Sequence, residues 1–344
     1  MKKRVLVVST FLREAGLPPS TCYVLTSLLT QAGFEIVTTS NKQGRLSRLA
    51  DMIVTAWRAR HQYAAACVDV FSGPAFIWAE AVCWTLRRAR KPYILMLRGG
   101  DLPLFASAHK GRVRRLLQSA STVVAPSRYL QEKMQPYRDG IRVLPNGIHL
   151  SAYRFRLRSS PRPRLAWLRS LAETYNPCMA VRVVAELSVE WPDLELVMAG
   201  ADKGDGSMQQ VERLAAELGV QSRVKLPGQV PKERVPDLFE RADIFLNTTN
   251  IDNTPISVLE AMACGLCVVS TDVGGIPYLV QNGHDALLVP PDDAPAMAEA
   301  VRRLLRQPAA AETLSRNARQ TAERCDWSRI IPQWQSIFAE VGGW

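Results

Sequence analysis

Residues 247–275 read NTTNIDNTPISVLEAMACGLCVVSTDVGG, and this stretch decides how the rest of the chain is interpreted. Its middle is an apolar run that predicts a short helix ending at Gly265, a residue that suits the left-handed position after a helix. Thr254 is a good N-cap, and Pro255 suits the first helical position. The free backbone N–H groups and the dipole at such a helix start favour phosphate or sugar oxygens nearby.

Two acidic residues frame the start of this helix. Asp252 precedes it, and Glu260, eight positions later, falls on the second turn among apolar side chains such as Leu259 and Met262. A carboxylate buried there needs a partner, because burying an unpaired charge is costly. A binding site for an oxygen-rich ligand is one interpretation, and a plain helix with one solvated acid is the other.

The residues after the helix predict a buried strand and a close turn. The strand over 267–271 runs into Gly274-Gly275, where backbone can approach a ligand closely. Cys264 and Cys267 have the spacing of a redox or metal motif, but they span a helix end and a buried strand with no second ligand pair nearby. We therefore expect them to pack in the core. The seven cysteines, scattered through apolar segments, fit reduced thiols.

Length and charge indicate two different halves. At 344 residues the chain exceeds one ordinary core, which predicts two domains. Residues 1–157 hold 24 Lys and Arg against 8 Asp and Glu, a net charge of +16, whereas the remainder carries −5. The basic clusters are interleaved with aromatic residues such as Trp57, Trp78 and Trp84, which favours attraction to anionic lipid; a solvated basic face is the alternative. Because no nucleic-acid-binding signature is present, we expect no nucleic-acid partner.

Two apolar stretches bear on localisation. Residues 5–8 have the length of a strand and no cleavage pattern of a secretory signal. Residues 63–86 are interrupted by Asp69, by Glu80 and by a Gly-Pro pair, so we predict strand, turn and helix there rather than a membrane span. The expectation is a cytoplasmic protein that can associate peripherally with the inner face of the plasma membrane.

Short β-branched runs alternate with helical patterns in two series, which is the signature of parallel α/β units. The predicted strands are 5–10, 35–39, 67–71, 93–97, 122–125 and 142–144, and then 164–168, 194–199, 224–226, 244–247, 267–270 and 286–289. The predicted helices include 21–32, 75–88, 178–189, 208–218, 295–306 and a last one over 327–341. Residues 151–163 form an Arg-, Ser- and Pro-rich linker. We therefore predict two doubly wound parallel-sheet domains facing across a cleft, with ligands beyond the carboxyl ends of the strands.

Residues 247–275 resemble the acidic-x7-Glu loop and helix of the family-4 retaining glycosyltransferases (glycosyl transferases group 1). That family has the B-type glycosyltransferase fold, GT-B. Further similar segments are VVAPS at 123–127, LPNGI at 144–148, RVKLPGQV at 223–230 and ADIFLN at 242–247. The resemblance covers nearly the whole chain and is strongest over residues 145–291. It implies an acceptor-binding Rossmann-like domain over 1–156, a donor-binding one over 157–326, and a C-terminal helix at 327–344 that packs back on the first domain.

The resemblance also implies roles for charged residues. An Arg at the end of the first strand of the second domain neutralises the departing diphosphate, and Arg169 matches it. The Lys usually found about five residues later is absent, since residues 174–177 read TYNP, and Lys203 is a hypothetical substitute. Asp252 takes the place of a Glu that contacts the donor sugar. Glu260 would accept hydrogen bonds from the ribose hydroxyls.

Further site residues follow from the same resemblance. The remaining donor-binding candidates are Asn253, Thr254, Pro255, Ile256, Ser257, Gly228, Val230, Gly274, Gly275 and Tyr175. Arg98, at a strand end, is a candidate to grip donor phosphate or an anionic acceptor, and a plain pair with Asp101 in a turn is the alternative. Gly16, Ser20 and Asp101 are the acceptor-side candidates. Neither a metal site nor a cofactor is expected, with a nucleotide-diphosphate sugar as the donor substrate.

The implied activity is a retaining, metal-independent hexosyl transfer from a nucleotide-diphosphate sugar to a glycan or lipid-linked acceptor, in surface polysaccharide or glycoconjugate biosynthesis. Two alternatives stay open. One is a catalytically impaired nucleotide-sugar-binding partner protein, suggested by the missing Lys and the shorter Asp252. The other is a sugar-nucleotide epimerase of the same fold. A Rossmann dehydrogenase is disfavoured because no G-x-G-x-x-G follows the first strand.

Overall fold

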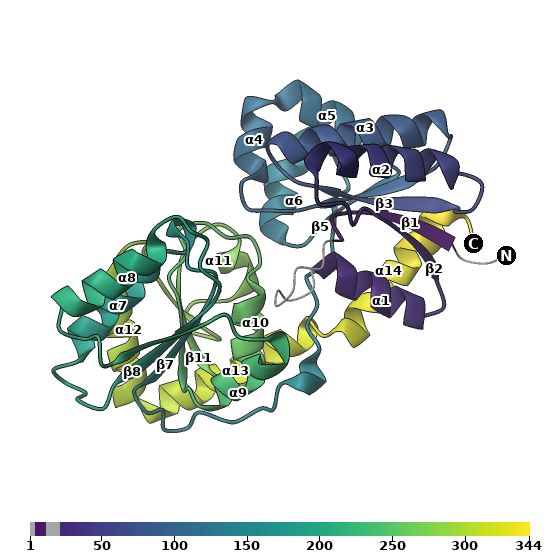
Figure 1. The fold of residues 1–344 in the computed structure, drawn as a ribbon. Coiled ribbons are helices and arrows are strands. Elements are labelled where there is room, and N and C mark those ends of the chain that lie inside the picture. Colours follow the sequence, from purple (N-terminus) through teal and green to yellow (C-terminus); the bar gives the residue numbers. More distant parts are fainter. Residues whose placement is uncertain (1–3, 12–20) are drawn as a thin grey trace. The chain divides into compact units, whose positions relative to one another are not determined.

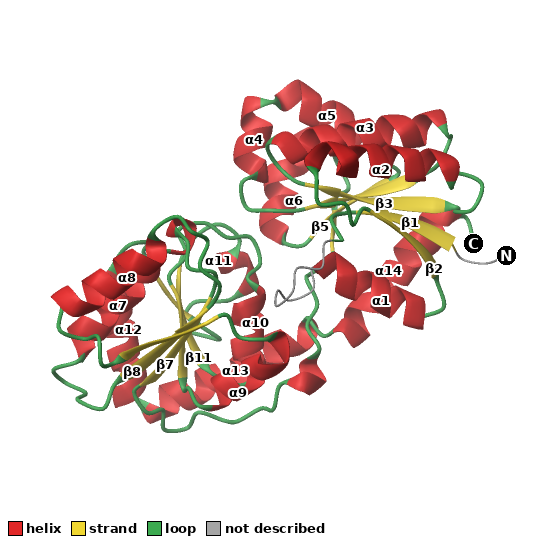
Figure 2. Ribbon diagram, viewed as in Figure 1, coloured by secondary structure: helices red, strands yellow, loops and turns green. Residues whose placement is uncertain are grey.

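A computed structural model describes residues 4–11 and 21–344 of the chain. The chain divides into two compact units, Met1–Gly147 with Trp327–Trp344, and Ile148–Asp326. Each unit is built on one six-stranded sheet with helices on both faces (Figures 1 and 2). The two units are described separately.

The first unit has a parallel sheet in the strand order β2-β1-β3-β4-β5-β6. Its strands are β1 (Arg4–Val8), β2 (Glu35–Thr39), β3 (Ala65–Val70), β4 (Tyr93–Leu97), β5 (Thr122–Ala125) and β6 (Arg142–Val143). Its helices are α1 (Thr21–Gln31), α2 (Arg45–Arg58), α3 (Pro74–Arg88), α4 (Leu102–Ala108), α5 (Lys110–Gln118), α6 (Arg128–Met134), the 3-10 turn η1 (Gln135–Tyr137) and α14 (Trp327–Gly342).

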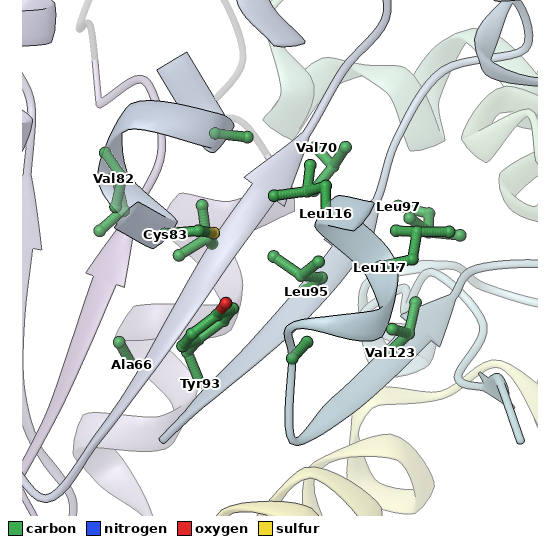
Figure 3. Packing of buried hydrophobic residues seen from close by; sticks show 14 of the residues in the cluster. Ala66, Val70, Val82, Cys83, Tyr93, Leu95, Leu97, Leu116, Leu117 and Val123 are labelled. Atoms are coloured by element: carbon green, nitrogen blue, oxygen red, sulfur yellow. The ribbon is translucent and has the colours of Figure 1, made fainter. Parts of the chain in front are cut away.

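Apolar side chains bury both faces of this sheet. On one face the helices from α2 to α6 pack against β3, β4 and β5, and Figure 3 shows part of that core around Tyr93, Leu95 and Leu97. On the other face α1 and α14 lie together, and Figure 1 shows them side by side. The C-terminal helix therefore belongs to the first unit, as the resemblance implied, because its buried stripe, which includes Trp334 and Phe338, completes this core.

The second unit has a parallel sheet in the order β12-β11-β10-β7-β8-β9. Its strands are β7 (Arg164–Leu168), β8 (Glu195–Ala199), β9 (Val224–Gly228), β10 (Ile244–Asn247), β11 (Cys267–Thr271) and β12 (Leu287–Val289). Its helices are α7 (Pro177–Leu187), α8 (Ser207–Glu217), α9 (Val235–Glu240), α10 (Ile256–Ala263), α11 (Ile276–Leu279), α12 (Ala294–Arg306) and α13 (Pro308–Arg324), with the 3-10 turns η2 (Leu150–Ala152), η3 (Glu173–Tyr175) and η4 (Lys232–Arg234).

Two hydrophobic clusters flank the second sheet. The helices α7, α8 and α12 cover one face, and α9 and α10 cover the other, while α13 contributes side chains to both clusters. Helix α10 is the most deeply buried of these, since every residue from Ser257 to Ala263 is buried. A short helix held this firmly can place its first turn accurately, because its packing leaves it no freedom to shift.

The predicted α/β fold with two doubly wound parallel sheets is confirmed, and each predicted strand is present with small differences at its ends. The second compact unit begins at Ile148, ahead of the domain boundary expected after residue 156. Side chains of the segment read as a linker are bound within that unit. Tyr153 donates to Glu260, and the buried guanidinium of Arg158 lies 3.3 Å from the carboxylate of Asp243.

Candidate functional site

The candidate site lies at the switch point of the second sheet. The chain runs from β7 outward through β8 to β9 and then returns to place β10 on the other side of β7. Ligands of open α/β sheets bind beyond the carboxyl ends of the strands at such a reversal. Arg169 directly follows β7, and the loop that carries Asp252 follows β10, so both candidates lie where the topology predicts a ligand.

Arg169 is the central cation of this loop cluster. Its Nη2 donates to Oδ2 of Asp252, and its guanidinium carbon lies 4.2 Å from the centre of the Tyr175 ring. Burial lowers the pKa of the Arg169 side chain. Its Nε is buried and has no hydrogen-bond partner among the residues that the structure describes. A buried donor without a partner is rare in native proteins and calls for an acceptor that the protein itself does not supply.

The backbone around Arg169 is fixed by close packing. The Arg169 N–H donates to the carbonyl of Ala199 at 3.1 Å, and Gly200 then passes directly beneath the Arg169 carbonyl. A Cβ at Gly200 would lie 1.6 Å from that carbonyl oxygen, so only glycine fits. On the other side, the Tyr175 carbonyl accepts from Thr248 Oγ1 at 2.8 Å, which anchors the ring on which the guanidinium stacks.

The Gly-Gly turn packs directly against the loop that carries Asp252. The Gly275 N–H donates to the Asp252 carbonyl at 3.0 Å. A Cβ at Gly274 would lie 2.1 Å from the Asp252 carbonyl oxygen, and one at Gly275 would lie 1.9 Å from that of Asn253. The two glycines therefore let one loop lie directly against the backbone of the other. Asp252 is held further by its own Oδ1, which accepts from the Asn253 N–H at 2.8 Å.

Helix α10 begins one residue later than the sequence indicated. Pro255, with extended backbone angles, occupies the N-cap, so the prediction of Thr254 as N-cap is wrong; the proline lacks the side-chain oxygen of a usual cap. Ile256 opens the helix and Ser257 follows it. The Ser257 hydroxyl is buried, and no described residue hydrogen-bonds to it. The end of the helix agrees with the prediction, since Gly265 has a φ of 77°.

Glu260 lies inside the protein with two partners. Its side chain is 2% exposed, and Oε1 accepts from the Tyr153 hydroxyl at 2.6 Å and also contacts the Lys232 ammonium. Burial raises the pKa of the Tyr153 hydroxyl, which keeps it protonated as a donor. Burial also lowers the pKa of Lys232 to about 8. The prediction that a carboxylate at this position needs a partner is therefore confirmed, and the solvated-acid interpretation is wrong.

The remaining candidates of the second unit surround these groups. Lys203 is exposed in the loop after β8, where its N–H donates to the Leu171 carbonyl at 3.2 Å, two residues beyond Arg169. Gly228 ends β9 with a φ of 72°, and its carbonyl accepts from the Gly200 N–H at 2.9 Å. Val230 packs, partly buried, on the cluster that contains α10. The loop ends of β7, β8, β9 and β10 are thereby linked.

Arg98 in the first unit is bound differently from the predicted turn pair. Its Nε donates to Asp69 Oδ1 at 3.0 Å and its Nη1 to Asn146 Oδ1 at 3.1 Å, whereas Asp101 is exposed. The alternative of a plain Arg98–Asp101 pair is therefore wrong. The reason is that β3 and β4 are neighbours, so residues at their carboxyl ends meet. Ser9, after β1, also donates to Asp69. Of the acceptor-side candidates, Gly16 and Ser20 lie outside the described residues.

The cysteines and helices answer two further questions. All seven cysteines are free thiols, and burial raises the pKa of Cys264 to about 11 and that of Cys267 to about 12, which fits the predicted core packing. No cluster of three His, Cys, Asp or Glu side chains suited to a metal ion occurs in residues 4–11 and 21–344. None of the helices in that part of the chain combines the length and the apolar character needed to cross a bilayer.

Sequence reasoning missed three groups at these sites. Lys232 and Tyr153 lie far from Glu260 in the sequence, and no local pattern indicates that their side chains converge on it. Asp69 was noted only as a charge that argues against a membrane span. Asp69 lies in the predicted strand 67–71, and the next predicted strand along the chain leads into Arg98; this placement was the signal that could have identified Asp69.

Comparisons with known proteins agree with this geometry. Residues 152–321 match the family model described as glycosyl transferases group 1. The chain is 29% identical to a D-inositol 3-phosphate glycosyltransferase from Saccharomonospora viridis over 219 residues, which are 59% of this chain and 51% of the relative. This match and those to two further relatives cover 51% to 65% of the relatives' own lengths.

Solved structures share the fold over nearly the whole chain. The sucrose-phosphate synthase from Thermosynechococcus elongatus superimposes with a TM-score of 0.81 at 18% identity, covering 99% of this chain and 100% of that one. HepE from Anabaena, solved in complex with UDP-glucose, gives a TM-score of 0.75 at 18% identity, with 98% and 99% coverage. At this identity the likeness establishes the fold, GT-B, and nothing more. The similarity to the glycosyl transferases group 1 thus rests on residues 152–321, which lie within the second unit.

Proposed function

We propose that this protein transfers a hexosyl group from a nucleotide-diphosphate sugar to a glycan or lipid-linked acceptor with retention of the anomeric configuration. One observation carries the proposal: Arg169 is buried with an unpartnered Nε, at the sheet's switch point, in contact with the loop that leads into α10. Ser257 Oγ, on the first turn of that helix, is a second buried polar atom without a described partner. A diphosphate would supply acceptors to both.

The departing diphosphate needs this kind of environment. Breaking the bond between the sugar C1 and the diphosphate oxygen leaves negative charge on the leaving group and positive character on C1. A fixed guanidinium and the N–H groups at a helix start stabilise that charge without having to reorganise. We propose that they take the part of a divalent cation, so that transfer proceeds without metal. Lys203, whose backbone N–H donates to the carbonyl of Leu171, two residues after Arg169 in the sequence, is the proposed second cation.

The two acids are proposed to hold the rest of the donor. Glu260 would accept from a ribose hydroxyl, and Asp252, already paired with Arg169, would face the donor sugar. The backbone of residues 253–257, the Gly228–Val230 loop and Tyr175 complete the donor side. In the retaining step the acceptor hydroxyl attacks C1 on the face that the diphosphate leaves. The C1–O bond to the acceptor forms, and the acceptor's proton passes to the departing phosphate oxygen.

The first unit is proposed to bind the acceptor beside an anionic membrane surface. Of the exposed large hydrophobic residues, several lie on α2 and α3, including Leu46, Trp57, Ile77 and Trp84. Arg60 stacks over Trp57 at 4.4 Å and Arg88 over Trp84 at 5.2 Å. Exposed aromatic rings beside guanidinium groups suit the interface of an anionic bilayer. We refer to Leu46, Trp57, Ile77 and Trp84 as the α2–α3 face.

The test separates this proposal from its two alternatives. The protein is incubated with UDP-, GDP- and ADP-sugars and with acceptor extracts, with and without EDTA. Release of free nucleotide that depends on acceptor, persists in EDTA and yields a retained anomer by NMR supports the proposal. Binding without turnover on any acceptor favours the impaired nucleotide-sugar-binding protein. Interconversion of the donor sugar favours the epimerase, and absence of any nucleotide binding contradicts all three.

A further inference from the structure

Glu260 is reached by two donors that both use the same oxygen. Tyr153 arrives from the segment before β7, and Lys232 arrives from η4, after the loop that follows β9. Both contacts end on Oε1, and no residue that the structure describes donates a hydrogen bond to the second oxygen, Oε2. Lys232 keeps part of its side chain in solvent, at 38% exposed, whereas Glu260 is 2% exposed. The ammonium therefore lies between solvent and a carboxylate that is nearly buried.

A carboxylate in this position depends on its cation. Without Lys232, the charge on Glu260 would be balanced only by the neutral hydroxyl of Tyr153, and a buried carboxylate in that state tends to take up a proton or to turn toward water. Protonation would weaken Oε2 as a hydrogen-bond acceptor, and rotation would move it away from the ligand. Other charged and titratable groups act on this pair. Glu233, next in the chain to Lys232, favours its protonated form, and burial opposes it.

We propose that Lys232 is a positioning residue for the donor nucleotide, holding Glu260 ionised and oriented so that Oε2 receives a ribose hydroxyl. This inference rests on the proposed function, because it takes the nucleotide to be the ligand. It assigns Lys232 to recognition of the ribose and not to neutralisation of the diphosphate. A charge-assisted hydrogen bond of this kind discriminates for a hydroxyl by roughly tenfold to a hundredfold.

The experiment measures two affinity ratios by calorimetry. The probes are UDP, GDP and ADP; the tightest binder is then compared with its 2′-deoxy and 3′-deoxy analogues and with its monophosphate. In K232M the preference for the ribonucleotide over the more discriminating deoxy analogue should fall to within about threefold of unity. The preference for diphosphate over monophosphate should stay unchanged. K232R should restore the ribose preference. The matched control is K225M, which removes a surface lysine of β9 that pairs with Glu195 at 2.7 Å.

The outcomes are distinguishable. If the wild-type protein binds none of the nucleotides, the proposed function fails and this inference fails with it. If the wild type binds but K232M keeps its ribose preference, only the inference is overturned. A loss of diphosphate preference in K232M also overturns it, because Lys232 would then serve the phosphates. Should K232M not fold, K232R and K232Q carry the test: the arginine must keep the ribose preference and the glutamine must lose it.

Discussion

Replacing Arg169 by Ala should reduce kcat by about 10²- to 10³-fold. The guanidinium is buried at 15% exposure, so its attraction to a phosphate oxygen is only partly screened. Two unit charges about 4 Å apart at an effective dielectric of about 20 attract by about 4 kcal/mol, which corresponds to roughly 10³-fold in rate. In the Ala variant Asp252 loses its cation and can be hydrated instead, which makes the loss in kcat smaller than that figure. Lys at this position keeps the charge but not the fork or the stacking on Tyr175, and should give an intermediate rate.

The assay is acceptor-dependent nucleotide release at saturating donor, with thermal unfolding measured in parallel. Arg164→Ala is the matched control, since Arg164 lies at the opposite end of the same strand. Its partner Asp243 retains contacts with Arg156 and Arg158, so its loss should leave kcat near the wild-type value. A wild-type kcat in Arg169→Ala, or an equal loss in both variants, would refute the reasoning that the buried guanidinium stabilises the leaving group.

Three further outcomes are expected. Gly275→Ala should lower the free energy of unfolding by about 1–3 kcal/mol and reduce kcat, since its Cβ would collide with the Asn253 carbonyl; thermal melts and rates measure this. The double variant Trp57→Ala/Trp84→Ala should bind vesicles with 30% phosphatidylglycerol at least about threefold more weakly in sedimentation, and unchanged binding would contradict the α2–α3 face. Burial lowers the pKa of Lys232 to about 8, so raising the pH from 7 to 9 removes its positive charge; ribose preference should fall through about pH 8 in the wild type and stay level in K232R.

Much of the fold could be predicted because parallel strands leave simple signals. Runs such as those of β5 (TVVA) and β11 (CVVST) are short, buried and rich in β-branched residues. The domain boundary could not be placed in this way. An Arg- and Pro-rich composition fits a solvated linker. It fits equally well a segment such as residues 153–158, whose Tyr and Arg side chains reach buried carboxylates. Only the tertiary contacts of those side chains decide between the two.

The candidate site was likewise predictable only in part. Asp252 and Glu260 were singled out by their spacing around the helix start, and Arg169 was implied by the family resemblance; the structure brings Arg169 into contact with Asp252. Glu260 was expected to have a partner, but the identity of Lys232 depends on how the loop after β9 folds over α10, which no periodicity encodes. The close packing of the Gly-Gly turn on the backbone that carries Asp252 is a further tertiary contact that the sequence did not indicate.

A crystal structure of the protein with the tightest-binding nucleoside diphosphate tests the central claim most directly. We expect an oxygen of the terminal phosphate within hydrogen-bond distance of Arg169 Nε and of an N–H group at the start of α10, and a ribose hydroxyl on Glu260 Oε2. A diphosphate bound elsewhere, with Arg169 in contact with Asp252 alone, would contradict the account.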